Sequence, residues 1–268
     1  MNPIQLTGVH KRFDDTPVLR GVDLHVGEGE TLALLGRSGS GKTVILRLVM
    51  GLLAPDRGQV RVQGRDLATL GMGEREAVHR DLGVLFQAGA LFDSMTALEN
   101  VMFPLTEREH LPVREARRRA VFALARVRLS SFEDAYPAAL SGGMRKRLAF
   151  ARAIAHTPKI LLLDDPTAGL DPLTTRSVLE IIRGGREREG VTTLIVTGDP
   201  RCAFAIADRI AFLHEGRILL TAPPAQLERS TDPALTAYLQ RWLLREQWQV
   251  PASAPPPERP AVAEAHAP

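Results

Sequence analysis

One glycine-rich segment constrains this chain more than any other, because it sets a lysine and a threonine directly after closely spaced glycines. In order, it consists of Gly36, Arg37, Ser38, Gly39, Ser40, Gly41, Lys42 and Thr43. The apolar residues 31–35 before it predict a buried strand, and residues 44–50 after it predict the start of a helix. A strand, a glycine-rich turn and a helix form the setting that a phosphate-binding loop requires. The segment therefore predicts binding of a nucleoside triphosphate.

The residue types in this segment explain that prediction. Glycines let the backbone turn tightly, so that successive N–H groups can surround phosphate oxygens. The N-terminus of the following helix adds positive potential at the same place. Lys42 can reach the outer phosphates, and the Thr43 hydroxyl can ligate Mg²⁺. The alternative is a chance glycine turn, but this pattern would arise by chance in only about one chain in a hundred of this length.

Composition excludes several other classes. The chain has 268 residues, and its single cysteine, Cys202, allows no internal disulfide. We expect a cytosolic protein, because no apolar run approaches the roughly 18 residues of a membrane span and no signal pattern opens the chain. The net charge of +3 is too small to indicate nucleic acid. We therefore expect no nucleic-acid partner, and membrane contact only through another subunit.

The order of strand and helix patterns predicts an α/β fold. We expect a P-loop NTPase core of mixed sheet and flanking helices, an antiparallel β subdomain and a helical insertion. The predicted ATPase domain covers 1–230, with its helical subdomain at about 88–158. Residues 231–249 predict a C-terminal amphipathic helix, whose apolar face contains Tyr238 and Trp242. The Pro/Ala-rich residues 250–268 predict a disordered tail.

Four further motifs follow the phosphate loop in a fixed order. They are Gln87 after a strand, Leu140–Met144 at a helix start, the apolar strand Ile160–Asp165 ending in two acids, and Ala168–Asp171. Together they resemble the ATP-binding subunit of ABC transporters over nearly all of residues 4–228. The Leu-Ser-Gly-Gly sequence at residues 140–143 makes the resemblance specific.

The resemblance implies roles for these residues. Asp164 holds Mg²⁺ together with Thr43, usually through water, and Gln87 completes the metal shell and senses the γ-phosphate. Asp165 polarises the attacking water, so that Asp165, Lys42 and Gln87 form the catalytic set. ATP and Mg²⁺ are the implied cofactors.

Other implied contacts involve a second subunit. In the family, Ser141, Gly142 and Gly143 face the nucleotide bound by the opposite ATPase subunit, and Asp171 lies at that dimer interface. Phe13 matches the aromatic residue that stacks on adenine. Each residue also has a plain structural alternative: Ser141 and Asp171 could merely cap helices, and Phe13 could belong to the core.

Two positions depart from the family pattern. Asp165 stands where the family usually has Glu, and Gly198 stands where it usually has a histidine that contacts the γ-phosphate. Asp is shorter than Glu by about 1.5 Å, and misplacement of about 1 Å can reduce a rate roughly a hundredfold. We therefore expect intact ATP binding with slow hydrolysis.

The segment 86–105 indicates the type of transporter. Its Gly-Ala-Leu-Phe-Asp-Ser-Met sequence at residues 89–95 resembles the Mla/Mce group, which transports phospholipids or other lipids across a bacterial envelope. This implies an integral-membrane permease as partner, a second ATPase subunit in a homodimer, and a place on the cytoplasmic face of the inner membrane. Another ABC importer, or an ATP-gated regulatory module with weak hydrolysis, is the alternative. A DNA-repair or translation ATPase fits less well, because the chain has neither a long coiled-coil insertion nor a second cassette.

Overall fold

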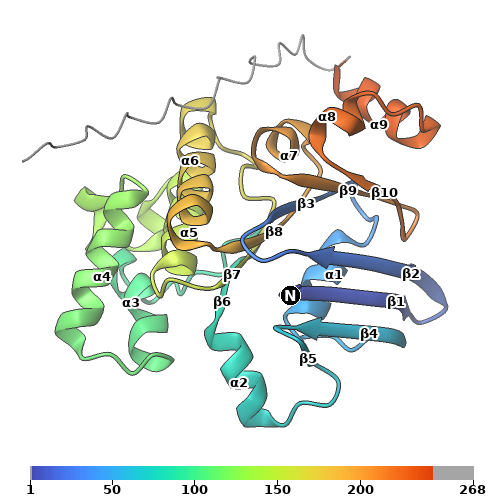
Figure 1. The fold of residues 1–268 in the computed structure, drawn as a ribbon. Helices are drawn as coiled ribbons and strands as arrows, with labels where there is room; N and C mark the ends of the chain where they lie inside the picture. Colours follow the sequence, from blue (N-terminus) through green and yellow to red (C-terminus); the bar gives the residue numbers. More distant parts are fainter. Residues whose placement is uncertain (1, 244–268) are drawn as a thin grey trace, which may run out of the picture.

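The computed structural model describes residues 2–243, in which the strands form two sheets (Figure 1). The larger sheet has six strands, and its two central strands and β7 are buried along their whole length, as expected for a sheet covered on both faces. In spatial order these strands are β10 (Arg217–Ala222), β9 (Arg209–His214), β3 (Thr31–Gly36), β8 (Thr192–Thr197), β7 (Ile160–Asp164) and β6 (Leu82–Leu85). Among the described strand pairs of this larger sheet, β9 and β10 are antiparallel and the others are parallel, so the sheet is mixed.

The parallel register brings the predicted site residues to one edge of this sheet. Leu35 of β3 lies opposite Thr197 of β8, and Asp164 of β7 lies opposite Val196. Leu85 of β6 lies opposite Leu163. The carboxyl ends of these strands therefore open onto one side, which is where ligands bind in open α/β sheets.

The smaller sheet is antiparallel and covers one side of the phosphate-loop helix. It consists of β2 (Thr16–Val26), β1 (Ile4–Phe13), β4 (Arg57–Val62) and β5 (Arg65–Asp66), in that spatial order. Helix α1 (Lys42–Val49) contacts strands of both sheets. Its buried residues Ile45, Leu46 and Leu48 share one apolar cluster with β1, β3 and β8. Burial of this cluster fixes α1, and with it the phosphate loop.

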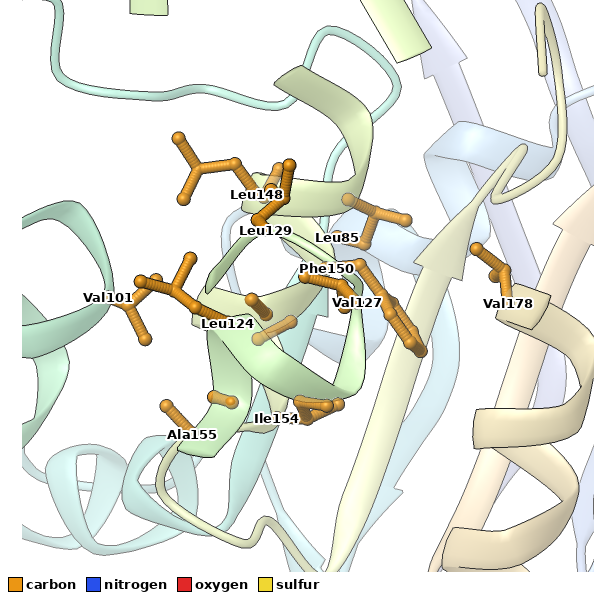
Figure 2. Packing of buried hydrophobic residues seen from close by; sticks show 14 of the residues in the cluster. Leu85, Val101, Leu124, Val127, Leu129, Leu148, Phe150, Ile154, Ala155 and Val178 are labelled. Carbon is orange, nitrogen blue, oxygen red and sulfur yellow. The ribbon is translucent and has the colours of Figure 1, made fainter. Parts of the chain in front are cut away.

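A helical layer packs against the β6 side of the large sheet (Figure 1). Helices α3 (Ala97–Glu107), α4 (Val113–Arg126) and α5 (Gly142–Ile154) contact one another. The small residues Ala116, Ala120 and Ala123, together with Leu124, form the buried face of α4, at the spacing of one helix face. These helices share a second apolar cluster with β6, part of which is shown in Figure 2, and this cluster includes Phe150 of α5.

Beyond β7 the described chain forms four helices: α6 (Pro172–Glu189), α7 (Pro200–Ile206), α8 (Pro224–Glu228) and α9 (Pro233–Leu243). The helix predicted from residue 231 is present as α9, and it packs on its own domain through Leu235 and Tyr238. Residues 244–249 of that prediction, and the predicted tail 250–268, lie outside the described residues. The chain also contains α2 (Met72–Arg80), which we did not predict because Val78 is its only buried residue and it lacks an apolar face. The predicted fold class is confirmed, while the domain limits remain predictions.

Candidate active site

The glycine-rich loop needs its glycines for two separate reasons. Gly39 and Gly41 have φ values of 78° and 106°, in the left-handed region that favours glycine. A Cβ atom on Gly41 would lie 2.7 Å from Cδ2 of Leu19, and one on Gly36 would lie 2.4 Å from the carbonyl oxygen of Leu213. Neighbouring segments therefore pack closely against Gly36 and Gly41 at the two ends of the loop. Arg37, Ser38 and Gly39, between them, are exposed.

Lys42 lies inside the loop. Its ammonium group donates to the carbonyl oxygens of Gly36 and Arg37, each at 2.9 Å. Burial lowers the pKa of Lys42, and the carboxylates of Asp165 and Asp164 partly offset that effect. The side chain is thus a buried cation, held by main-chain oxygens where it can exchange them for phosphate oxygens.

One polar atom of the loop is buried without a partner. The Ser40 hydroxyl has no hydrogen-bond partner among the residues that the structure describes. A Cβ on Gly39 would meet nothing within 4 Å, so the loop is open beside that glycine. Buried polar atoms are normally hydrogen-bonded, and a phosphate oxygen would satisfy this hydroxyl. The loop therefore fits a polyphosphate.

Thr43 and Asp164 form the predicted metal site. The Thr43 hydroxyl donates to Oδ2 of Asp164 at 3.1 Å, joining α1 to the end of β7. Burial raises the pKa of Asp164, and the Thr43 hydrogen bond acts in the opposite direction. Gln87 follows β6 at the same sheet edge and is exposed. A hydroxyl, one carboxylate and an amide suit Mg²⁺, which usually takes its remaining ligands from water and substrate phosphates.

Asp165 has an unusual backbone. Its φ is 47°, which is uncommon for a residue other than glycine. Its N–H donates to Val196 at 2.8 Å, and its Oδ1 accepts from the N–H of Gly198 at 3.2 Å. The Lys146 ammonium group donates to the carbonyl oxygen of Asp165 and, at 2.9 Å, to that of Ala168. Sequence reasoning missed Lys146, whose only signal was its place in the basic run at residues 145–147.

Gly198 is held from two sides. Besides the bond to Asp165, its carbonyl oxygen accepts from the Tyr238 hydroxyl at 2.6 Å. A Cβ on Gly198 would have only the carbonyl oxygen of Gly36 nearby, at 3.6 Å, and the position has no left-handed φ. The backbone therefore does not require glycine here. Sequence reasoning placed Tyr238 on an apolar helix face and gave no signal for its hydroxyl.

The remaining predicted residues, on β1 and at the starts of α5 and α6, make no hydrogen bond to Lys42, Thr43, Asp164 or Asp165 among the described residues. The Ser141 side chain accepts from the N–H of Met144 at 3.2 Å, and Asp171 accepts from the N–H of Thr174 at 2.9 Å, so both cap helices. Gly142 and Gly143 form the first turn of α5. Phe13 ends β1 with 42% of its surface exposed, and the Lys11 ammonium lies 5.6 Å from its ring centroid. Among residues 2–243, no hydrogen bond joins any of these five residues to the phosphate loop.

The sequence is similar to known transport proteins. A profile of the ABC transporter family matches residues 19–168. A methionine import ATP-binding protein, MetN, from Mesorhizobium japonicum is 39% identical over 82% of this chain and 60% of its own length. A sulfate/thiosulfate import ATP-binding protein, CysA, from Caulobacter vibrioides is 41% identical over 86% of this chain and 68% of its own. The chain therefore spans about 60% of the methionine relative. Neither relative is named for the lipid transport that residues 86–105 predict.

Solved structures agree with this similarity. The dimeric structure of MJ0796, a bacterial ABC transporter cassette, superposes with a TM-score of 0.78 and 33% identity, covering 82% of this chain and 98% of that one. The same cassette in a post-hydrolysis state bound to ADP and Pi also has a TM-score of 0.78, at 32% identity. The likeness thus covers nearly the whole of that cassette.

Proposed function

The chain belongs to the ABC transporter family, and from that premise we propose that it is an ATPase that drives a membrane transporter. One observation supports this most strongly: Lys42, Thr43, Asp164 and Asp165, which come from two separate motifs, meet at one sheet edge. In this proposal the loop binds the phosphates of ATP, and the Thr43–Asp164 pair holds Mg²⁺ with Gln87. The cargo and the membrane subunit belong to the same proposal.

The residues of the chain would act as follows. The loop N–H groups and Lys42 bind the β- and γ-phosphates, with Lys42 leaving the carbonyl oxygens of Gly36 and Arg37. Mg²⁺, when bound, would neutralise charge on the same phosphates. Asp165 would orient and polarise water for in-line attack. Position 198 supplies no side chain to the γ-phosphate, so we expect turnover to be slow.

We propose that two copies form the working unit. Ser141 and Asp171 are exposed at the starts of α5 and α6, although no second chain is needed for their caps. Exposed helix N-termini are anion sites, and Ser141, Gly142 and Gly143 would there complete the nucleotide site of the other copy. The dimeric state of the similar cassette MJ0796 supports this arrangement.

The permease would dock on the segment after Gln87. The side chain of Asn100 is fully buried and bonds to both main-chain atoms of Phe92, at 2.9 and 3.0 Å. This clamp leaves 38% of Phe92 exposed, with its ring 4.6 Å from that of Phe103. A rigid, partly exposed aromatic pair suits a helix of a membrane subunit. No helix within residues 2–243 combines the length and apolar character needed to cross a bilayer. The proposed place is the cytoplasmic face of the membrane, reached through the permease.

The cargo has two candidates. The methionine and sulfate relatives support import of a small solute, which replaces lipid transport as the first candidate. Lipid transport remains the second, because the sequence of residues 86–105 resembles the Mla/Mce group. Reconstitution with the permease that copurifies would separate them: uptake of methionine or sulfate supports the first candidate, and movement of labelled phospholipid between vesicles supports the second.

The core of the proposal has its own test. ATP hydrolysis would be measured for the purified chain alone and with the permease in lipid nanodiscs. We expect the permease to increase hydrolysis, and Phe92→Ser to lose that increase. Phe122→Ser is the matched control, because Phe122 is an exposed phenylalanine on α4. Nucleotide binding without hydrolysis in either state would instead indicate an ATP-gated regulatory module.

A further inference from the structure

Helix α9 places the hydroxyl group of Tyr238 at the active-site edge of the large sheet. Leu235 is fully buried among Ala33, Leu35 and Phe212, and its N–H is capped by Asp232 at 2.9 Å. One turn later, Tyr238 is 4% exposed, with its ring centroid 5.3 Å from that of Phe212. Its phenol is therefore held by packing, so the position of its hydroxyl is set by the fold.

That hydroxyl meets the two loops that flank the phosphate site. It donates to the carbonyl oxygen of Gly198 at 2.6 Å and lies 3.3 Å from that of Gly36, the first residue of the phosphate loop. A phenol has one proton to donate, so the shorter contact to Gly198 is the main bond. Burial raises the pKa of Tyr238, which keeps the hydroxyl protonated and able to donate.

Gly198 in turn is bonded to Asp165, whose carboxylate would act on water. The N–H of Gly198 donates to Oδ1 of Asp165 at 3.2 Å. Gly198 is thus fixed at its carbonyl by Tyr238 and at its N–H by Asp165. These two bonds act together with the bond from the N–H of Asp199 to the Thr197 hydroxyl, at 3.0 Å, to hold the loop.

We infer that Tyr238 is a positioning residue for ATP hydrolysis, which holds the Gly198 loop and through it orients the Asp165 carboxylate. The inference rests on the proposed ATPase function. It gives α9, which lies outside the family-matched residues 19–168, a part in turnover. It also predicts that docking of α9 and hydrolysis are coupled.

The test removes the hydroxyl and keeps the ring. Tyr238→Phe should lower kcat by about three- to tenfold, the factor that one hydrogen bond of ordinary net strength represents. KM for ATP and the affinity for ADP should stay within about twofold of wild type, because the phosphate loop and Lys42 are unchanged. Thr193→Val is the control, since the Thr193 hydroxyl on β8 is buried without a partner in the described structure. It should keep the wild-type kcat.

Two results would overturn the inference. One is an unchanged kcat in Tyr238→Phe. The other is a parallel fall in kcat, ADP affinity and Tm, which would mean a purely structural role. Absence of hydrolysis in the wild type would contradict the proposed function instead. Hydrogen exchange at the amides of residues 197–199 would then decide the inference: faster exchange in Tyr238→Phe than in wild type and Thr193→Val supports it, and equal exchange rejects it.

Discussion

The ammonium group of Lys146, on α5, donates to the main-chain carbonyl oxygen of Asp165, the residue with left-handed backbone at the end of β7. The same ammonium donates to Ala168, so that one side chain closes the whole turn after β7. A left-handed conformation costs roughly 1–2 kcal/mol for most residues other than glycine, and Asp and Asn adopt it more readily because their short polar side chains hydrogen-bond locally. Lys146 therefore helps to hold the Asp165 backbone in this conformation, together with the bonds of Asp165 to Val196 and Gly198.

Lys146→Met tests this relationship. Methionine retains the aliphatic part of the side chain but donates to neither carbonyl oxygen, so the turn should relax and Asp165 should shift. We expect kcat for ATP hydrolysis to fall about tenfold, since misplacement of a reacting group by about 1 Å can reduce the rate roughly a hundredfold. ADP binding should be retained. Lys159→Met is the control, because the Lys159 side chain forms an exposed ion pair with Asp81. Equal kcat values in both variants would show that the turn does not need Lys146.

Gly198→His combined with Asp165→Glu should restore the usual residues of the family. The backbone at position 198 can accept a side chain, because a Cβ there would lie 3.6 Å from the nearest atom, the carbonyl oxygen of Gly36. We expect hydrolysis to rise by about tenfold or more, since an imidazole would contact the γ-phosphate and the longer carboxylate would reach the water. Gly198→Ala separates the effect of the Cβ from that of the imidazole. An unchanged rate in the double variant would reject the view that these two positions limit turnover.

Thr43→Val should weaken the response to Mg²⁺. Valine has nearly the same shape as threonine but cannot ligate the metal or donate to Asp164. We expect the Mg²⁺ concentration for half-maximal hydrolysis to increase about tenfold or more, in line with the loss of a group that holds a ligand. Removal of Mg²⁺ by a chelator should stop wild-type hydrolysis. Thr106→Val on α3, where the hydroxyl bonds only within its own helix, should behave as wild type.

His156 should make the protein less stable in mild acid. Burial lowers the pKa of His156 to about 4, and its Nε2 lies 3.1 Å from the carbonyl oxygen of Leu82. In the unfolded chain the imidazole takes up a proton near its ordinary pKa of about 6.5. The unfolded state thus binds more protons as the pH falls from about 6.5 to about 4, and stability is lost over that window. Between about pH 7 and pH 5 we expect a loss of about 2 kcal/mol from this group.

Urea unfolding at the two pH values measures this loss. His156→Gln keeps a donor for Leu82 and should remove most of the pH dependence. His110→Asn is the control, because His110 is exposed and has a positive φ that asparagine tolerates. If His156→Gln lost as much stability as the wild type, the acid sensitivity would have another source.

The sequence was informative where residues carry periodicity or a motif. The buried strands were predictable, because a short apolar run such as residues 160–163 is typical of a parallel strand that is covered on both faces. The loop glycines were predictable from their motif. Helix α2 was missed, since its polar residues have no pattern that indicates burial. Lys146 and Tyr238 were missed for a different reason: each acts on a main-chain carbonyl oxygen, and such an acceptor exists at every residue. Partners of that kind can be found only once the fold sets which backbone lies nearby.

Strand β3, which leads into the phosphate loop, pairs with β8 and β9, and these lie more than 150 residues later in the sequence. A ribosome makes residues 31–43 early, but β3 has no partner strand until the chain has passed Thr197, and it lacks its second neighbour until the chain has passed His214. Such long-range pairing is slow to form and leaves an apolar strand exposed in the meantime. We therefore expect nascent chains stalled before residue 214 to bind no nucleotide and to be the ones that chaperones protect.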